Sequence, residues 1–157
     1  MDIRIRICGL EDVEPLVYYA LKLAFDTEDK TLDKELVTLG VTNLIKAPKL
    51  GTYYLAEVKQ GETWKHIGTT MVSFEMQPRL GGLIHMIQSV YVDAEYRGKG
   101  VFRKLYEKCC EVAKEDPKTL GVRLYVDHDN FTAMTVYEKL GMGKMDTWAF
   151  DEKDMVF

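Results

Sequence analysis

Apolar residues recur along the first part of the chain with two different spacings. Over residues 3–7 isoleucine alternates with arginine, and this period of two predicts a half-buried strand. From about Asp12 the period becomes helical, and Pro15 falls in the first turn, where a missing N–H is tolerated. The apolar stripe of this helix is Val13, Leu16, Val17, Ala20 and Ala24. Residues 32–45 predict a second helix, which ends before Pro48.

The middle of the chain changes to strand-like runs separated by short turns. These runs cover residues 52–58, 67–74 and 83–92. A polar turn at 60–62 joins the first two runs, and a turn at 78–82 joins the last two. Because the connections are so short, we expect antiparallel hairpins.

Helical spacing returns after Gly100 and again after Asn130. The first of these helices has the apolar positions Phe102, Leu105, Tyr106, Cys109 and Val112. A strand then alternates at Val122, Leu124 and Val126. Asn130 can cap the next helix, which ends at Gly141 and has the apolar face Ala133, Val136, Tyr137 and Leu140. A last strand is expected at 144–150, and Val156 with Phe157 fits one more.

The resulting order, β-α-α-β-β-β-α-β-α-β, predicts a single α/β domain over residues 1–157. Its front half is mostly antiparallel. Parallel pairing is expected within the strand–helix–strand segment from Leu83 to Val126, because such a crossover returns the chain to the same end of the sheet.

Composition excludes several classes of function. The formal net charge is -4, which gives no sign of the basic face that nucleic-acid binders usually carry. No apolar run reaches the roughly 20 residues of a membrane span, and the N-terminus lacks the pattern of a signal peptide, so a cytoplasmic protein is expected. The cysteines have no metal-ligand spacing and are interpreted as reduced, mostly packing thiols: Cys8, Cys109 and Cys110. No metal is expected, because the histidines are widely separated: His66, His85 and His128.

The segment from Val90 to Val101 carries the main chemical signal. A strand ends, a short loop follows, and Arg97-Gly98-Lys99-Gly100 opens a helix. Glycine permits a positive φ and leaves room for a ligand. The first N–H groups of a helix have no internal partner and lie at the positive end of its dipole. A diphosphate is the natural ligand of such a turn, although a plain helix start with solvated basic residues would also show Gly-x-Gly.

Two other phosphate-binding turns do not fit this segment. The Walker A spacing is absent, and the dinucleotide fingerprint would need a third glycine where the chain has Arg103. The turn and the motif Asn130-x-x-Ala133-x-x-x-Tyr137-x-x-x-Gly141 together resemble the cofactor half of the GNAT superfamily of acetyltransferases, over about residues 83–142. Two positions depart from the family: Glu95 stands where Gln or Arg is common, and Phe102 replaces a small residue.

The resemblance implies a fold, a reaction and a set of contacts. The fold is a mixed, mostly antiparallel sheet whose central parallel pair splays apart to hold acyl-CoA, flanked by about four helices. The reaction transfers the acetyl group of acetyl-CoA to an amine by direct attack in a ternary complex, without a metal. The implied cofactor-binding residues are Val90, Tyr91, Val92, Arg97, Gly98, Lys99, Gly100, Val101, Phe102, Arg103, Asn130 and Tyr137.

Proton transfer is assigned only in part. The resemblance makes Tyr137 the general acid that protonates the departing thiolate, whereas its place on an apolar stripe also fits a core aromatic. The family often has a glutamate base at strand positions that are Met86 and Gln88 here. Glu75 is the first candidate for the base, ahead of His85, and proton removal through ordered water is equally compatible.

Three alternative functions follow from the same residues. The main one is a non-catalytic CoA or acyl-CoA sensor of the same fold, and the second is a transferase of longer acyl groups. A nucleotide-binding regulatory domain is disfavoured by the absent phosphate motifs. The acceptor stays open among small amines, amino-acid derivatives, polyamines, aminoglycoside-like compounds and protein N-termini, and a homodimer is compatible with the sequence.

Overall fold

The computed structural model describes residues 1–147. The chain divides into two compact units, Met1–Tyr125 and a second one that begins at Val126. Within residues 1–147, the first unit holds all five strands and three of the four helices, and the second holds the fourth helix. Whether the chain behaves as a single domain stays a prediction.

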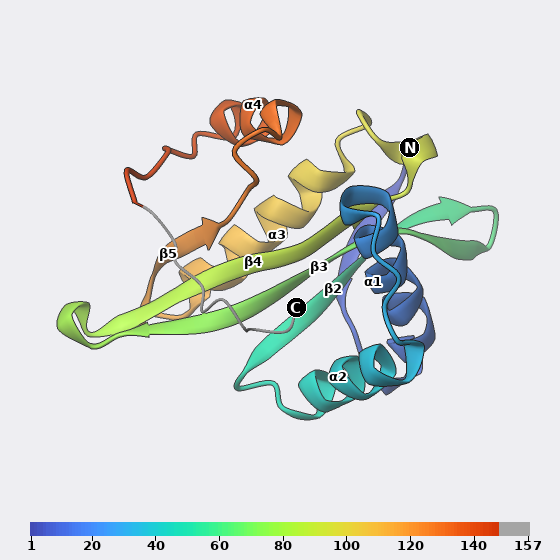
Figure 1. Cartoon of the computed structure of the whole chain (residues 1–157), viewed down its shortest axis with the longest axis horizontal. Coiled ribbons are helices and arrows are strands. Elements are labelled where there is room, and N and C mark those ends of the chain that lie inside the picture. The colour runs from blue at the N-terminus through green and yellow to red at the C-terminus, as the bar shows by residue number, and fades with distance from the viewer. Residues whose placement is uncertain (148–157) are drawn as a thin grey trace. The chain divides into compact units, whose positions relative to one another are not determined.

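The first unit is built on a five-stranded sheet in the order β1-β2-β3-β4-β5 (Figure 1). The first three pairings are antiparallel, and β4 and β5 run parallel. The predicted mixture of one parallel pair with an antiparallel front half is therefore confirmed. The strands are β1 (Ile3–Ile7), β2 (Gly51–Gln60), β3 (Thr63–Gln77), β4 (Gly82–Val92) and β5 (Thr119–Leu124).

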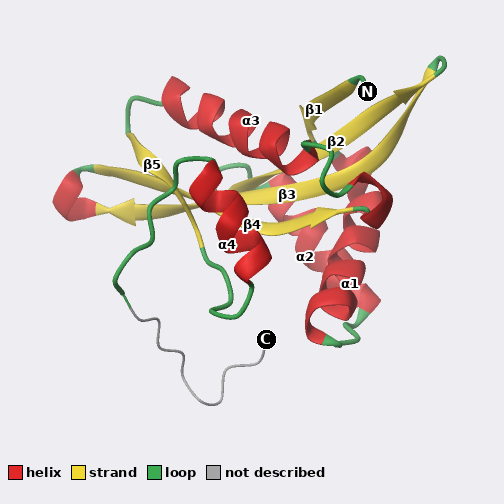
Figure 2. Ribbon diagram, turned by 90° about the horizontal axis from the view of Figure 1, so that it is seen from above, coloured by secondary structure: helices red, strands yellow, loops and turns green. Residues whose placement is uncertain are grey.

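Helices cover both faces of this sheet (Figure 2). On one face lie α1 (Val13–Glu28) and α2 (Lys34–Lys46), and on the other lies α3 (Val101–Glu115). The helix α2 begins where the sequence offers a cap, because the Asp33 side chain accepts hydrogen bonds from the backbone N–H groups of Glu35, at 2.8 Å, and Leu36, at 3.1 Å. Short 3-10 turns precede α1, join β3 to β4 and follow β4: Leu10–Asp12, Pro78–Leu80 and Ala94–Tyr96.

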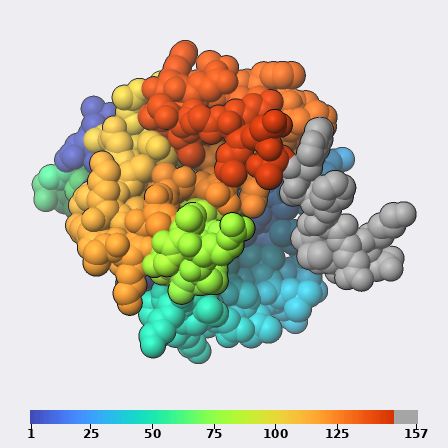
Figure 3. Space-filling model, turned by 90° about the vertical axis from the view of Figure 1, so that its left-hand side faces the viewer, coloured from blue at the N-terminus to red at the C-terminus, as the bar shows by residue number. Residues whose placement is uncertain are grey.

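The β3–β4 hairpin ends in an exposed turn. Pro78–Leu80 forms a single 3-10 turn, and Gly81 closes it with a φ of 70°, a conformation that glycine adopts without strain. This tip lies on the surface of the molecule (Figure 3). The predicted hairpin is thus confirmed, with strands longer than the apolar runs alone indicated.

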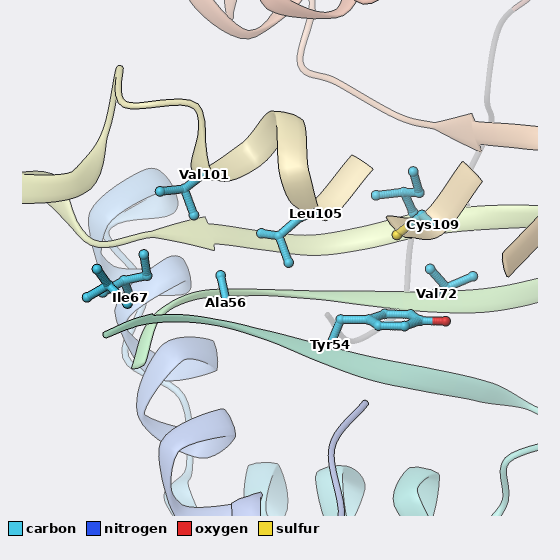
Figure 4. Packing of buried hydrophobic residues seen from close by; sticks show 9 residues of the cluster. Tyr54, Ala56, Ile67, Val72, Val101, Leu105 and Cys109 are labelled. Carbon is cyan, nitrogen blue, oxygen red and sulfur yellow. The ribbon is translucent and has the colours of Figure 1, made fainter. Parts of the chain in front are cut away.

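The core between the sheet and α3 is made by one stripe of the helix. Val101, Leu105 and Cys109 are each about 1% exposed or less, and they point from α3 toward the sheet residues Ala56 and Val72 (Figure 4). Leu105 and Cys109 lie on this stripe as predicted. The other predicted positions, Phe102, Tyr106 and Val112, are only partly buried, and Val101 and Ala113 are buried in their place. Burial raises the pKa of the Cys109 thiol to about 12, which fits its predicted packing role.

A second core lies between the sheet and the other two helices. Leu16 and Val17 of α1 pack there with Val41 of α2 and with Leu55 and Tyr91 of the sheet. The sequence placed Ala20 on the buried stripe. The larger Tyr19 is buried instead, at 2% exposure, because its ring packs on that of Tyr91 with 5.6 Å between centroids.

A cluster of charges around two buried carboxylates, Glu57 and Asp12, links β1 to its neighbours. The Glu57 carboxylate lies 2.6 Å from Arg4 Nε, 3.1 Å from Arg6 Nε and 3.2 Å from His66 Nε2. Arg6 also donates two hydrogen bonds of 2.7 Å to the buried Asp12 carboxylate just before α1. Removing one partner of such a cluster leaves a buried charge uncompensated, which is strongly destabilising.

The second unit contains α4 (Phe131–Lys139). The predicted cap is confirmed, because Asn130 Oδ1 accepts a hydrogen bond from the Ala133 N–H at 3.1 Å, and Gly141 follows the helix with a φ of 86°. The strand expected at 144–150 is absent over 144–147, where no described strand pairs with the chain. Residues 148–150, Val156 and Phe157 lie outside the described residues.

Candidate active site

The turn between β4 and α3 has the backbone that its two glycines predict. Gly98 and Gly100 have φ values of 72° and 81°, in the left-handed region that other residues adopt only with strain. A Cβ atom added to either glycine would meet no atom within 4 Å. The positive φ angles therefore explain why glycine occupies both positions, and the space next to each Cα atom is open.

The first turn of α3 leaves its donors outside the helix ladder. The first backbone bond into the helix runs from the Lys104 N–H to the Gly100 carbonyl, at 3.2 Å. The N–H groups of residues 98–103 precede that bond, at the positive end of the helix dipole. Gly98 and Lys99 are exposed, and Val101 is the buried residue that anchors the helix start. This geometry suits an anion.

Basic side chains surround the turn, and its one acidic departure from the family is neutralised. Lys65 Nζ lies 2.7 Å from Glu95 Oε1, so the carboxylate is paired within the protein. Lys99 Nζ lies 5.6 Å from the centre of the Tyr96 ring, and Arg103 is exposed on the next turn. The second departure, Phe102, packs beside Tyr106 with 6.3 Å between ring centroids.

The strand β4 is distorted just before this turn. Tyr91 pairs with Thr69 and Gln88 pairs with Met71, so Ser89 and Val90 both lie opposite a single residue of β3. Ser89 has a φ of 49°, which is uncommon for a residue other than glycine. This β-bulge bends the strand and re-aims its backbone groups.

Just before the bulge, β4 loses its parallel neighbour. Pairing with β5 stops where Ile87 faces Leu124. Within residues 1–147, positions 88–92 of β4 have a strand partner only in β3. Their other edge can accept an extended ligand in the way that a sheet accepts an added strand. The carbonyl of Val92 is already used, because it accepts a hydrogen bond from Arg97 Nε at 2.9 Å.

The predicted general acid and its helix belong to the second unit. Tyr137 is half-buried on α4, two turns after Asn130. A phenol is protonated at neutral pH, as a proton donor must be, and burial raises the pKa of the Tyr137 hydroxyl further. Its action at the thioester, like the cofactor contact of Asn130, stays a prediction.

The two candidate bases lie on opposite faces of the sheet. Glu75 pairs with Ile84 in the β3–β4 ladder, and its carboxylate lies 3.5 Å from Arg123 Nη1. Gln88 lies four positions after Ile84, which is about 13 Å along a strand, so Glu75 reaches the bulge only through water. His85 is buried on the α3 face, where its Nε2 lies 3.0 Å from the Thr119 hydroxyl, and burial lowers its pKa.

Sequence reasoning missed a polar network behind the turn. The Tyr91 hydroxyl donates to Asp26 Oδ2 at 2.6 Å, and the Tyr19 hydroxyl donates to Asp93 Oδ2 at 3.3 Å. All four residues line a groove of about 840 Å³ that runs along α1. No motif marks Asp26 or Tyr19, because only the packing of α1 brings them to the end of β4.

Two further findings concern metals and membranes. Over the described residues, no group of three or more His, Cys, Asp or Glu side chains is arranged to hold a metal ion. None of the helices in that part of the chain combines the length and apolar character that a bilayer crossing requires.

Comparison with known proteins agrees with this geometry. Residues 17–142 match the model of the acetyltransferase (GNAT) family, and the chain therefore belongs to that family. The resemblance inferred from the turn and the α4 motif is confirmed. Among curated proteins, no sequence matches the chain significantly.

Solved structures carry the same fold. A possible acetyltransferase from Clostridium difficile 630 is 31% identical, with a TM-score of 0.86 over 98% of this chain and 99% of the other. A predicted acetyltransferase from Clostridium acetobutylicum, solved with acetyl-CoA, is 19% identical, with a TM-score of 0.77 and 96% coverage of both chains. Glucosamine-6-phosphate N-acetyltransferase from Arabidopsis thaliana is 21% identical, with a TM-score of 0.73 over 98% of this chain and all of the other, at 100%.

Proposed function

We propose that this protein is a cytoplasmic N-acetyltransferase that transfers the acetyl group of acetyl-CoA to an amine. The observation that carries the proposal is the position of the Arg97–Gly100 turn. It offers unused N–H groups and positive charge directly after the stretch of β4 that has lost its parallel neighbour. A ligand with a diphosphate at one end and an extended amide chain at the other matches both features.

The diphosphate of acetyl-CoA would lie on the N–H groups of residues 98–103, next to Arg97 and Lys99. The pantetheine arm would then run along Val90–Val92 and pair with the open edge of β4. The bulge at Ser89 lies at the far end of that path. The thioester would therefore reach the point where β4 and β5 separate.

The chemistry is the attack of a neutral amine on the thioester carbonyl. The C–N bond forms, the carbonyl oxygen becomes an oxyanion, and the C–S bond then breaks to release CoA. A backbone N–H of the bulged segment 88–90 would donate to the oxyanion, which is a large source of stabilisation in acyl transfer. An amine acceptor is supported by the name of the Arabidopsis neighbour, an N-acetyltransferase of this fold.

Three proton transfers complete the reaction: the nitrogen loses two protons and the sulfur gains one. An alkylammonium has a pKa near ~10, so its proton must leave before attack. Glu75 would accept that proton through ordered water, since it faces the α1 and α2 side together with Gln88. Tyr137 would protonate the departing thiolate. The phenolate left behind would regain a proton from the attacking nitrogen, through water, as the tetrahedral intermediate collapses.

The proposal is tested by thiol release. The purified protein is mixed with acetyl-CoA and a panel of small amines, amino-acid derivatives, polyamines, aminoglycosides and peptides, and free CoA thiol is measured. At least one class should give turnover above the hydrolysis background, with an N-acetylated product detected by mass. Tight CoA binding without turnover on any amine would instead favour a non-catalytic CoA sensor. The sequence argument for a sensor is that Met86 and Gln88 stand where the family often has a glutamate base.

A further inference from the structure

Arg97 is held by three contacts, two from the end of β4 and one from α1. Its Nε donates to the Val92 carbonyl at 2.9 Å, its guanidinium lies 5.4 Å from the centre of the Tyr91 ring, and its Nη2 is 3.9 Å from Asp26 Oδ2. Half of the side chain is nevertheless exposed, at 54%. An exposed arginine without such partners loses considerable rotamer entropy when it binds an anion.

Contacts other than the one with Arg97 hold the Asp26 side chain in place. It lies on α1, where Lys22 Nζ is 3.2 Å from Oδ1 and the Tyr91 hydroxyl donates to Oδ2 at 2.6 Å. The Tyr91 bond and, after it, the Lys22 contact lower the pKa of Asp26, so the carboxylate is charged at neutral pH. Tyr91 is buried at 5% exposure, so its hydroxyl is a fixed donor that holds one oxygen of this surface carboxylate in place.

From this arrangement we propose that Asp26 is a positioning residue for Arg97. With Nε on Val92 and Nη2 toward Asp26, the guanidinium is kept beside the turn with one nitrogen, Nη1, uncommitted to these partners. The inference rests on the proposed function, in which Arg97 binds the diphosphate of CoA. A side chain that is already held in its binding geometry binds an anion more tightly, because it loses less conformational entropy on binding.

The direction in which CoA affinity changes when the Asp26 charge is removed distinguishes a positioning role from simple electrostatic repulsion. A carboxylate close to an anion site repels the anion, so removing its charge would by itself tighten binding. A positioning role predicts the opposite, because Asp26→Asn frees the guanidinium. Glu28→Gln removes the same charge from the same helix without any contact to Arg97, since Glu28 pairs with Lys30 at 2.7 Å.

The test is a double-mutant cycle on CoA affinity, measured by calorimetry on the full chain. Asp26→Asn should weaken binding by roughly three- to fivefold, the upper range for an exposed ion pair, and Glu28→Gln should leave it unchanged. In an Arg97→Gln background Asp26→Asn should have no further effect. Tyr91→Phe, which keeps the ring and removes only the hydroxyl, should weaken binding in the same direction.

Kinetics with two donors complete the test. The KM for acetyl-CoA should rise in Asp26→Asn at nearly constant kcat, while the KM for S-acetylpantetheine, which has no diphosphate, should not change. Unchanged or tighter CoA binding in Asp26→Asn, or equal weakening with and without Arg97, would overturn the inference and leave the proposed function standing. Failure of the unaltered protein to bind CoA at all would overturn both.

Discussion

The carbonyl of Gly100 accepts the first hydrogen bond of α3, from the Lys104 N–H at 3.2 Å, while the Gly100 backbone itself is left-handed. The reversal of the chain and the start of the helix therefore fall on the same residue. Because of this, the donors of the first turn follow directly on the end of β4. The separation between the strand and the anion site is thus fixed by local backbone geometry.

Replacing Tyr137 by Phe should remove the proposed proton donor and keep the ring. A general acid contributes about 10²–10⁴-fold, so kcat should fall by that order with little change in CoA affinity. Loss of one hydroxyl should cost at most about 1.5 kcal/mol of stability. Tyr125→Phe, at an exposed position, is the matched control and should behave as the unaltered protein. A Tyr137→Phe enzyme with full kcat at every pH would show that the tyrosine only packs.

The Arg6–Asp12 pair predicts acid sensitivity of the fold. Its hydrogen bonds to Arg6 lower the pKa of Asp12, below the unfolded value of about 3.9. The pair therefore stabilises the fold fully above that unfolded value, and the contribution is lost as the pH falls through the folded pKa. Asp12→Asn should lower the free energy of unfolding at pH 7 by about 1–3 kcal/mol, less than for a fully buried pair because Arg6 is partly solvated.

Urea unfolding at several pH values provides the measurement for this pair. The stability difference between the unaltered protein and Asp12→Asn should shrink as the pH is lowered toward the folded pKa of Asp12. Glu14→Gln, an exposed change in the first turn of α1, serves as the control. A difference that stays constant down to the lowest pH would mean that Asp12 contributes by packing alone.

Glu75 should act as a base only through water, and the pH profile of the Glu75→Gln variant tests this role. Glu75→Gln should reduce kcat/KM by on the order of 10²-fold and move the acidic limb of the pH profile. Because Glu75 also contacts Arg123, Arg123→Gln is needed as a control and should leave that limb in place. If Glu75→Gln keeps the acidic limb, the proton leaves the amine by solvent alone.

Chelation should leave the activity unchanged. The proposed steps use backbone N–H groups, a phenol and a carboxylate, none of which needs a metal ion. The measurement is thiol release after exhaustive dialysis against a chelator, followed by addition of single divalent metals. Activity that disappears on dialysis and returns with one metal would contradict the mechanism.

The sequence predicted the fold where periodicity and turn chemistry agree. All five strands and four helices of the described residues were anticipated in type and order, because alternating isoleucines, hairpin turns and a capping Asn130 are local signals. The expected strand after Gly141 was wrong over residues 144–147. Alternation there was weak, and a strand requires a partner that local sequence does not specify.

The site was predictable only where it is made of backbone. Gly98 and Gly100 are visible in the sequence because their conformation demands glycine. The bulge at Ser89 has no such signature, since a serine in the left-handed region looks like any strand serine. The link between Asp26 and Arg97 was equally hidden, because the two residues are far apart in the sequence and only the packing of α1 on β4 brings them together.

The central claim is the anion site at the start of α3, and calorimetric titration with CoA tests it most directly. Gly100→Val places a branched side chain at a left-handed position in front of the N–H groups, and Gly61→Val introduces the same strain in the β2–β3 turn, at a φ of 60° and also in open space. Both variants should lose a similar stability, about 1–3 kcal/mol. CoA binding should be abolished in Gly100→Val and retained in Gly61→Val, whereas unchanged CoA affinity in Gly100→Val would contradict the account.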